Sequence, residues 1–475
     1  MTLSPSLTGS EPARRQSGNW NVGESPGEAM SFLCLIPLLL APAFWNGFPI
    51  IYYDTGAYVL EGLGGQFLVE RSPVYSLFLR FGGGGLSLWL IVLIQSALVS
   101  FAITQTARVL VPRLSFVFVL LIGALLVIAT GLPWYVGQVE PDCFTVLVVL
   151  PLYLLAFHRQ SLGSIRARIL IAIAALAVAA HPSHLLLAIF LVILVALIRA
   201  VLRFVKSTSD SKLRLLEPVI VCLCGLAMVL CANFFFTGAV FVSRAGPTFV
   251  FARMLQDGIV MRLLEDTCPQ SGYKLCAYKD SLPATADGFL WTPRSPFVAL
   301  GHFAGTEAES ARIVRAAILR YPLLQIRAAA ANASAQFVKF GTGDQIEPQE
   351  WVLAPVLRHY IPSQMRAYFA ARQQRGEIRF RGISRLDVAV GFVSLTGVSL
   401  LFLWFLLKRR TEPAAFHGFV LAALIGNAAI CGILSGPHDR YQSRLVWLAS
   451  LAIMVGNPRV LASCGAGSNP AGKVA

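Results

Sequence analysis

Repeated apolar runs close to membrane-spanning length constrain the fold of this chain more than any other feature. A helix needs about 20 mostly apolar residues to cross a bilayer. Such runs lie at residues 31–48, 86–104, 114–132, 142–157, 169–181, 184–198, 217–236, 387–407, 415–434 and 444–460. Only 13% of the residues are charged, against roughly a quarter in soluble domains. We therefore expect an all-α polytopic membrane protein with about 10 transmembrane helices.

The runs also divide the chain into parts with different composition. Residues 1–30 are rich in Ser, Gly, Pro and Glu, which is typical of a disordered tail. The remaining parts are an N-terminal transmembrane module of about seven spans at 31–236, a polar loop domain at 237–386, C-terminal transmembrane helices at 387–460 and a tail at 461–475. We expect one large loop domain set between two groups of spans.

Basic residues indicate the orientation of the spans. Lys and Arg concentrate in alternate short loops, and such loops face the cytoplasm in membrane proteins. The same parity places 237–386 outside the cytoplasm. The runs at 169–181 and 184–198 have basic residues at both far ends, which favours a tight hairpin or re-entrant pair with Pro182 at the turn.

The extracytoplasmic loop domain has two local features. Its stretch Glu307 to Ala331 has the pattern of a helix. Its only cysteines are Cys268 and Cys276, and an isolated pair in an oxidising compartment predicts a disulfide.

Polar side chains gather in four segments that the charge pattern places on the outer side. They are Asp54 and Arg71 in the first segment, Glu140 and Asp142 in the second, His181 and His184 in the third, and His438, Asp439, Arg440 and Arg444 in the last. Ionisable groups are costly near a bilayer, so each of these residues is a candidate functional residue. We expect Asp54 to be catalytic and the other residues to bind substrate.

Each segment also has a purely structural interpretation. Asp54 could cap a short helix that begins at Thr55, and Glu140 and Asp142 could complement a helix dipole. The histidine pair favours a structural role over metal binding, because Pro182 separates the two rings. Arg440 and Arg444 could anchor the last span or pair with Asp439, and the aromatic residues Tyr52, Tyr53, Tyr58, Trp134 and Tyr135 favour an interfacial belt.

If the four segments form one site, their chemistry suits glycosyl transfer from a phosphosugar. A lone carboxylate such as Asp54 can take a proton from an acceptor hydroxyl, while arginines stabilise a departing phosphate. The cytoplasmic loops are too short to bind a nucleotide sugar, so an enzyme on the outer face would need a lipid-linked donor.

The first outer loop, with Asp54 followed by the sequence RSPVYSLFL from Arg71, resembles the GT-C superfamily of polyprenyl-phosphate-dependent glycosyltransferases. The Glu140-Pro141-Asp142 triplet is similar to an acidic motif in the second outer loop of some members. The resemblance covers about residues 31–236 and implies Asp54 as the catalytic base, a lipid-linked sugar donor, and an active face outside a bacterial inner (plasma) membrane. The chain departs from some branches because Thr55, and not a second acid, follows Asp54, and because its large polar segment lies between spans.

Other interpretations remain open. The outer residues could form the vestibule of a transporter or flippase for lipid-linked glycans, although the sequence shows no repeated halves and no acid deep within a span. The chain could also be a non-catalytic assembly protein that presents 237–386 to a partner. A divalent metal cofactor is possible without a defined ligand set. We expect contacts with membrane lipids and no nucleic acid, since the basic residues form no groove.

Overall fold

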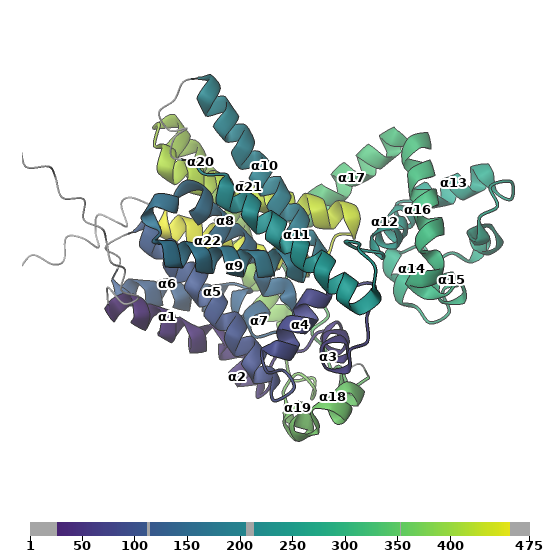
Figure 1. Cartoon of the computed structure of the whole chain (residues 1–475), viewed down its shortest axis with the longest axis horizontal. Coiled ribbons are helices and arrows are strands. Elements are labelled where there is room, and N and C mark those ends of the chain that lie inside the picture. The colour runs from purple at the N-terminus through teal and green to yellow at the C-terminus, as the bar shows by residue number, and fades with distance from the viewer. Residues whose placement is uncertain (1–25, 112–114, 206–212, 352, 457–475) are drawn as a thin grey trace, which may run out of the picture.

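The computed structural model describes residues 26–111, 115–205, 213–351 and 353–456, and this part of the chain is helical without a named strand (Figure 1). A helix overlaps each apolar run of the sequence. These helices are α1 (Pro26–Leu39) with α2 (Ala41–Asn46), α5 (Leu88–Leu110), α6 (Phe116–Ala129), α8 (Thr145–Phe157), α9 (Ser164–Ala180), α10 (Pro182–Phe204), α11 (Leu216–Thr237), α20 (Phe380–Leu407), α21 (Thr411–Leu434) and α22 (Asp439–Val455).

Six helical segments in the described part are long and apolar enough to cross a membrane: Gly27–Asn46, α5, α10, α11, α20 and α21. Their outward faces carry bare apolar side chains. On α10, for example, Ile193, Leu197 and Val201 are more than half exposed although each is aliphatic. An apolar surface of this kind suits lipid and not water. The chain therefore has the all-helical architecture of an integral membrane protein.

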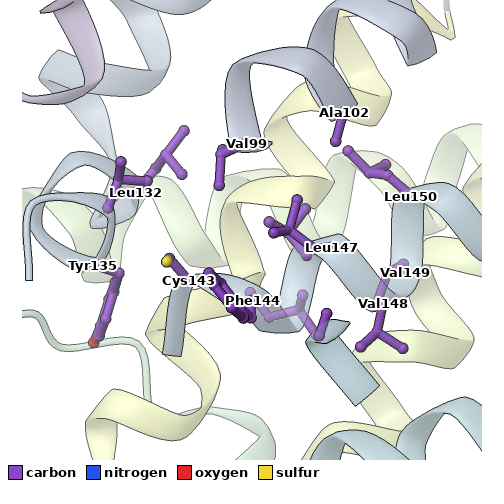
Figure 2. Close-up of a cluster of buried hydrophobic side chains, with 14 of the residues drawn as sticks. Val99, Ala102, Leu132, Tyr135, Cys143, Phe144, Leu147, Val148, Val149 and Leu150 are labelled. Atoms are coloured by element: carbon purple, nitrogen blue, oxygen red, sulfur yellow. The ribbon is translucent and has the colours of Figure 1, made fainter. Parts of the chain in front are cut away.

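Helix α8 lies at the centre of the helical bundle. Every residue from Thr145 to Ala156 is buried, so the helix is apolar on all sides. Figure 2 shows its side chains Leu147 and Leu150 beside Val99 and Ala102 of α5. A helix enclosed by neighbours in this way gives a rigid base to the residues that precede it, which include Glu140 and Asp142.

The segments between the long apolar helices form shorter helices. They are α3 (Thr55–Gly64), α4 (Pro73–Phe81), α7 (Leu132–Val136), η1 (Pro141–Phe144), α12 (Gly246–Gln256), α13 (Ile259–Thr267), η4 (Lys274–Ser281), α14 (Ala286–Trp291), α15 (Pro296–Ala299), α16 (His302–Arg320), α17 (Pro322–Phe337), α18 (Ala354–Tyr360), η5 (Pro362–Gln364) and α19 (Met365–Ala370), while η2 (Arg159–Ser161) follows α8. Helices α12 to α16 project to one side of the bundle, as Figure 1 shows at the right.

The segment 237–386 consists of two structural parts. Residues between Ala245 and Ala317 have a hydrophobic core of their own, whereas Phe340, Leu357 and Tyr368 belong to the core of the bundle. The predicted disulfide between Cys268 and Cys276 is present in the first part.

Several boundaries differ from the sequence predictions. The tail predicted at 1–30 overlaps a helix, because α1 begins at Pro26. The rest of that tail (1–25) and the C-terminal tail predicted at 461–475 lie outside the described residues. The helix predicted from Glu307 to Ala331 is two helices, α16 and α17, because Pro322 ends the first. The short pair around Pro182 is two helices of 17 and 23 residues, since both continue through their basic ends.

Candidate functional site

Two backbone hydrogen bonds join the segment before Asp54 to the segment before Glu140. Ile50 forms an isolated parallel bridge with Gln138, through hydrogen bonds of 2.8 Å from Ile50 N to Gly137 O and 3.0 Å from Val139 N to Ile50 O. The hydroxyl of Thr55 also donates to Val139 O at 3.1 Å. These contacts hold Asp54 beside the segment that carries Glu140 and Asp142.

Asp54 faces arginines. It precedes α3, but its side chain accepts no hydrogen bond from that helix, so the capping interpretation is wrong. Its Oδ2 instead lies 2.7 Å from Nη1 of Arg71 and 3.8 Å from Nη2 of Arg440. Arg71 is held in place because the next residue, Ser72, caps α4 and donates to Ala179 O at 2.6 Å. Asp54 is therefore bound as an anion between two cations.

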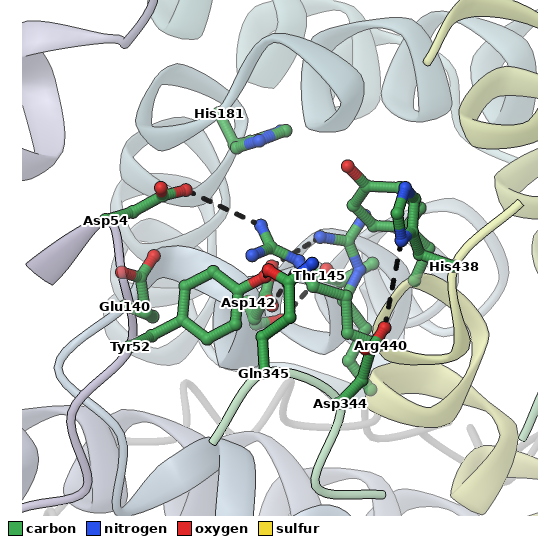
Figure 3. A network of polar contacts seen from close by, with 12 residues as sticks. Tyr52, Asp54, Glu140, Asp142, Thr145, His181, Asp344, Gln345, His438 and Arg440 are labelled. Atoms are coloured by element: carbon green, nitrogen blue, oxygen red, sulfur yellow. Dashed lines mark hydrogen bonds and ion pairs between the residues drawn. The ribbon is translucent and has the colours of Figure 1, made fainter. Parts of the chain in front are cut away.

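Helix α22 supplies the other half of the site. Arg440 and Arg444 are four residues apart, so they lie on one face of the helix. Asp142 lies between them, 3.5 Å from Nε of Arg440 and 2.6 Å from Nη1 of Arg444. All three side chains are at most one-tenth exposed. We call Asp54, Arg71, Glu140, Asp142, Arg440 and Arg444 the charge cluster (Figure 3).

Glu140 differs from the other acids of the charge cluster. It is 1% exposed, and neither of its carboxyl oxygens has a hydrogen-bond partner in the described part of the chain. Burial and the nearby Asp54 carboxylate raise the pKa of Glu140 well above its usual range. The three guanidinium groups thus face Asp54 and Asp142, which form ion pairs with them, and Glu140, which does not.

Some guanidinium donors of the charge cluster remain unused. The Nε groups of Arg71 and Arg444 are buried and have no hydrogen-bond acceptor among the described residues, while Nε of Arg440 has only the Asp142 carboxylate at 3.5 Å. Buried donors without acceptors are costly, so a group that accepts from them would be bound favourably. An anion with several oxygens, such as a phosphate, can accept from more than one guanidinium group at once.

Aromatic and amide groups that sequence reasoning did not assign to the site cover the charge cluster. The ring of Tyr52 stacks on Arg440, whose Cζ lies 4.2 Å from the ring centroid, and its hydroxyl donates to Gln345. Tyr58 and Tyr135 are also buried, so the aromatic-belt interpretation fails for these rings, and Tyr53 alone is 40% exposed. In the sequence, Tyr52 could be suspected as a site residue because it stands in an aromatic pair just before Asp54. Nothing in the sequence around Gln345 marks that residue as part of the site.

The remaining predicted residues lie at or beyond the edge of the charge cluster. His181 caps α10 by accepting from Ser183 N, and Ser183 in turn accepts from Arg444 at 3.3 Å. His184 is buried between Thr145 and Ala177 O, which is a structural role. Neither histidine contacts the carboxylates directly.

The two residues before Arg440 point away from the arginines. Asp439 accepts from Gly341 N at 2.9 Å and does not pair with Arg440 or Arg444. His438 lies 3.9 Å from Asp344 and 4.0 Å from Asp287, which belongs to α14. No group of three or more acids, histidines or cysteines in the described residues is placed to hold a metal.

A buried acid beside the charge cluster leads to a prediction about pH. Glu61 of α3 is fully buried and accepts hydrogen bonds from Leu68 N and Ser76 Oγ. Burial raises its pKa to about 7, whereas an unfolded glutamate titrates near about 4.3. Between these pH values the folded chain keeps the Glu61 proton, whereas the unfolded chain has released it. The free energy of unfolding therefore falls as the pH rises from about 4.3 to about 7 and is constant above that range.

We expect Glu61→Gln to remove that loss, so the Tm of the variant minus that of the wild type should increase from pH 4 to pH 7. Thermal unfolding of the purified protein across this range measures it. Glu265→Gln, at an exposed position of α13, should leave the difference flat. Parallel Tm curves for Glu61→Gln and the wild type would contradict the prediction.

No protein-family model, no curated protein and no solved structure matches the chain. The case for a function therefore depends on the contacts and charges of the cluster itself.

Proposed function

We propose that the chain is a membrane glycosyltransferase that moves a sugar from a polyprenyl-phosphate donor to an extracytoplasmic acceptor. The observation that carries the proposal is the convergence of three arginines on one cluster, in which the Nε donor of Arg71 is buried without an acceptor among the described residues. In this proposal the chain has about ten spans, and the charge cluster faces outward in a bacterial inner (plasma) membrane.

The ion-paired residues of the charge cluster each have a defined part in the proposed reaction. Arg71 and Arg440 bind the donor phosphate, and Arg444 holds Asp142 in place beside Arg440. Asp54 takes the proton of the acceptor hydroxyl as the acceptor oxygen bonds to the anomeric carbon. The bond from that carbon to the phosphate oxygen breaks, and the lipid phosphate leaves with the electron pair, stabilised by the two arginines.

The position of the charge cluster supports a lipid-linked donor. The cluster lies where the outer segments meet α22, at the ends of apolar helices such as α8. A donor whose phosphate reached the charge cluster could keep its polyprenyl chain beside the exposed apolar faces of neighbouring helices. A soluble nucleotide sugar would gain nothing from that surface.

Binding of the reaction product tests the proposal. We expect wild-type protein in nanodiscs to bind a radiolabelled polyprenyl phosphate and not the matching polyprenol, because the alcohol cannot use the arginines. Arg440→Gln should weaken binding about 10- to 100-fold, which corresponds to the loss of a hydrogen bond to a charged group. Arg320→Gln, at an exposed ion pair with Asp266, serves as control.

Turnover separates the proposed transferase from a transporter. The purified protein is given a series of radiolabelled polyprenyl-phosphate monosaccharides, and free polyprenyl phosphate is measured. Equal binding of the alcohol and the phosphate would reject the phosphate site. Movement of the lipid across proteoliposomes without release of the sugar would favour a flippase in place of the transferase.

A further inference from the structure

A second buried acid lies outside the charge cluster, in a helix that is otherwise suited to lipid. Asp387 is 4% exposed near the outer end of α20, one of the helices long and apolar enough to span a membrane. Its Oδ2 has no hydrogen-bond partner among the described residues. Sequence reasoning placed Asp387 at the boundary of a span and gave it no role.

Asp387 lines a small cavity. The other polar groups in the wall are the hydroxyls of Thr130, Ser443 and Ser450, and the apolar part includes Phe340 and Trp447. No lysine or arginine contributes to the lining. The cavity has a volume of about 10 Å³, which is room for one particle the size of a water molecule.

Hydroxyl groups lie close to the acid on two sides of the cavity. Oγ of Ser443, a lining residue, is 2.8 Å from Oγ1 of Thr342. Ser450 is in turn 2.7 Å from Ser394 of α20. A buried anion with hydroxyl partners alone still needs a compensating positive charge.

The donor atoms and the size of the cavity select among cations. Carboxylate and hydroxyl oxygens are hard ligands, and a site without imidazole or thiolate suits hard cations better than copper or zinc. Magnesium keeps several of its waters and needs octahedral space, so a cavity for a single water-sized particle is too small. A dehydrated monovalent ion of about the size of sodium remains.

We propose that the Asp387 cavity binds Na⁺ between α20, α22 and the segment that contains Phe340. The ion is held by Oδ2 of Asp387 with the hydroxyl oxygens of Ser443, Ser450 and Thr130. Because Ser443 precedes Arg444 in α22, the bound ion fixes the helix turn that also carries the charge cluster. The proposal does not depend on the proposed transferase activity, since no residue of the charge cluster lines the cavity.

Thermal unfolding of the full chain in nanodiscs tests the site. The Tm is measured in NaCl, KCl, MgCl₂ and N-methylglucamine chloride at equal ionic strength. We expect Na⁺ alone to raise the wild-type Tm by about 2 °C or more, with the increase growing as the logarithm of its concentration. Asp387→Asn should lose the increase, and Ser399→Ala, a hydroxyl of α20 that does not line the cavity, should keep it.

Direct binding of ²²Na⁺ completes the test. Saturable binding by the wild type, absent in Asp387→Asn and weakened at least about 10-fold in Ser450→Ala, supports the site even if one variant is too unstable to melt cooperatively. A wild-type Tm that responds to pH and not to Na⁺ would show a protonated acid with water in the cavity and would overturn the proposal. The same holds if Asp387→Asn binds ²²Na⁺ as the wild type does.

Discussion

Asp54→Asn is expected to abolish sugar transfer and to leave a folded protein in the membrane. A general base contributes roughly 10²- to 10⁴-fold to the rate, and an amide cannot take the proton of an acceptor hydroxyl. The asparagine keeps the size of the side chain and an oxygen that can accept from Arg71, which lies 2.7 Å from Asp54. Transfer should therefore decrease more than stability does.

Single-turnover release of polyprenyl phosphate measures the chemical step for this variant, and binding of the radiolabelled lipid phosphate measures donor affinity. We expect the rate to fall about 100-fold or more and donor affinity to remain, because Arg71 and Arg440 are still present. Glu70→Gln is the matched control, since Glu70 lies in the same loop next to Arg71 but forms no ion pair with it. An unchanged rate in Asp54→Asn would remove Asp54 from the mechanism.

The helices were predictable because the apolar runs mark them directly, but their ends were not. Helix α9 starts at Ser164 and includes Arg166 and Arg168, and α10 continues through Arg199 and Arg203. Hydropathy counts such residues against a span, although a helix can continue into the interface and its arginines can reach the headgroups. The true pair is consequently longer than the apolar runs at 169–181 and 184–198.

The charge cluster was predictable as a list of residues and not as a set of contacts. The spacing of Arg440 and Arg444 already puts both on one helix face. That Asp142 lies between them depends on a contact separated by 302 residues, and the bridge between Ile50 and Gln138 sets the approach of Asp54. Long-range contacts of this kind leave no local pattern, which is also why the cavity at Asp387 was missed.

The pairing of Asp142 predicts the largest effect on stability. Arg444 is fully buried and Asp142 is 2% exposed, so both were removed from water on folding. Breaking a buried ion pair by removing one partner costs about 3–5 kcal/mol, because the other charge stays buried without compensation. Asp142→Ala leaves Arg444 with only neutral groups, namely Ser183, Asn427 and Cys431, and leaves Arg440 with the more distant Asp54.

We therefore expect Asp142→Ala to lower the free energy of unfolding by about 3–5 kcal/mol, measured by equilibrium unfolding in SDS mixed with a mild detergent. Arg444→Met should cost less, because Asp142 keeps Arg440 at 3.5 Å. Glu377→Ala, which breaks ion pairs whose side chains are 40–50% exposed, should cost about 0.2–1 kcal/mol. Asp142→Ala and Arg444→Met remove a similar number of side-chain atoms, so loss of packing alone would make their costs similar. A larger cost for Asp142→Ala would therefore come from the arginine charge that it leaves without a partner. Equal losses for Asp142→Ala and Glu377→Ala would show that Asp142 does not neutralise the arginines of α22.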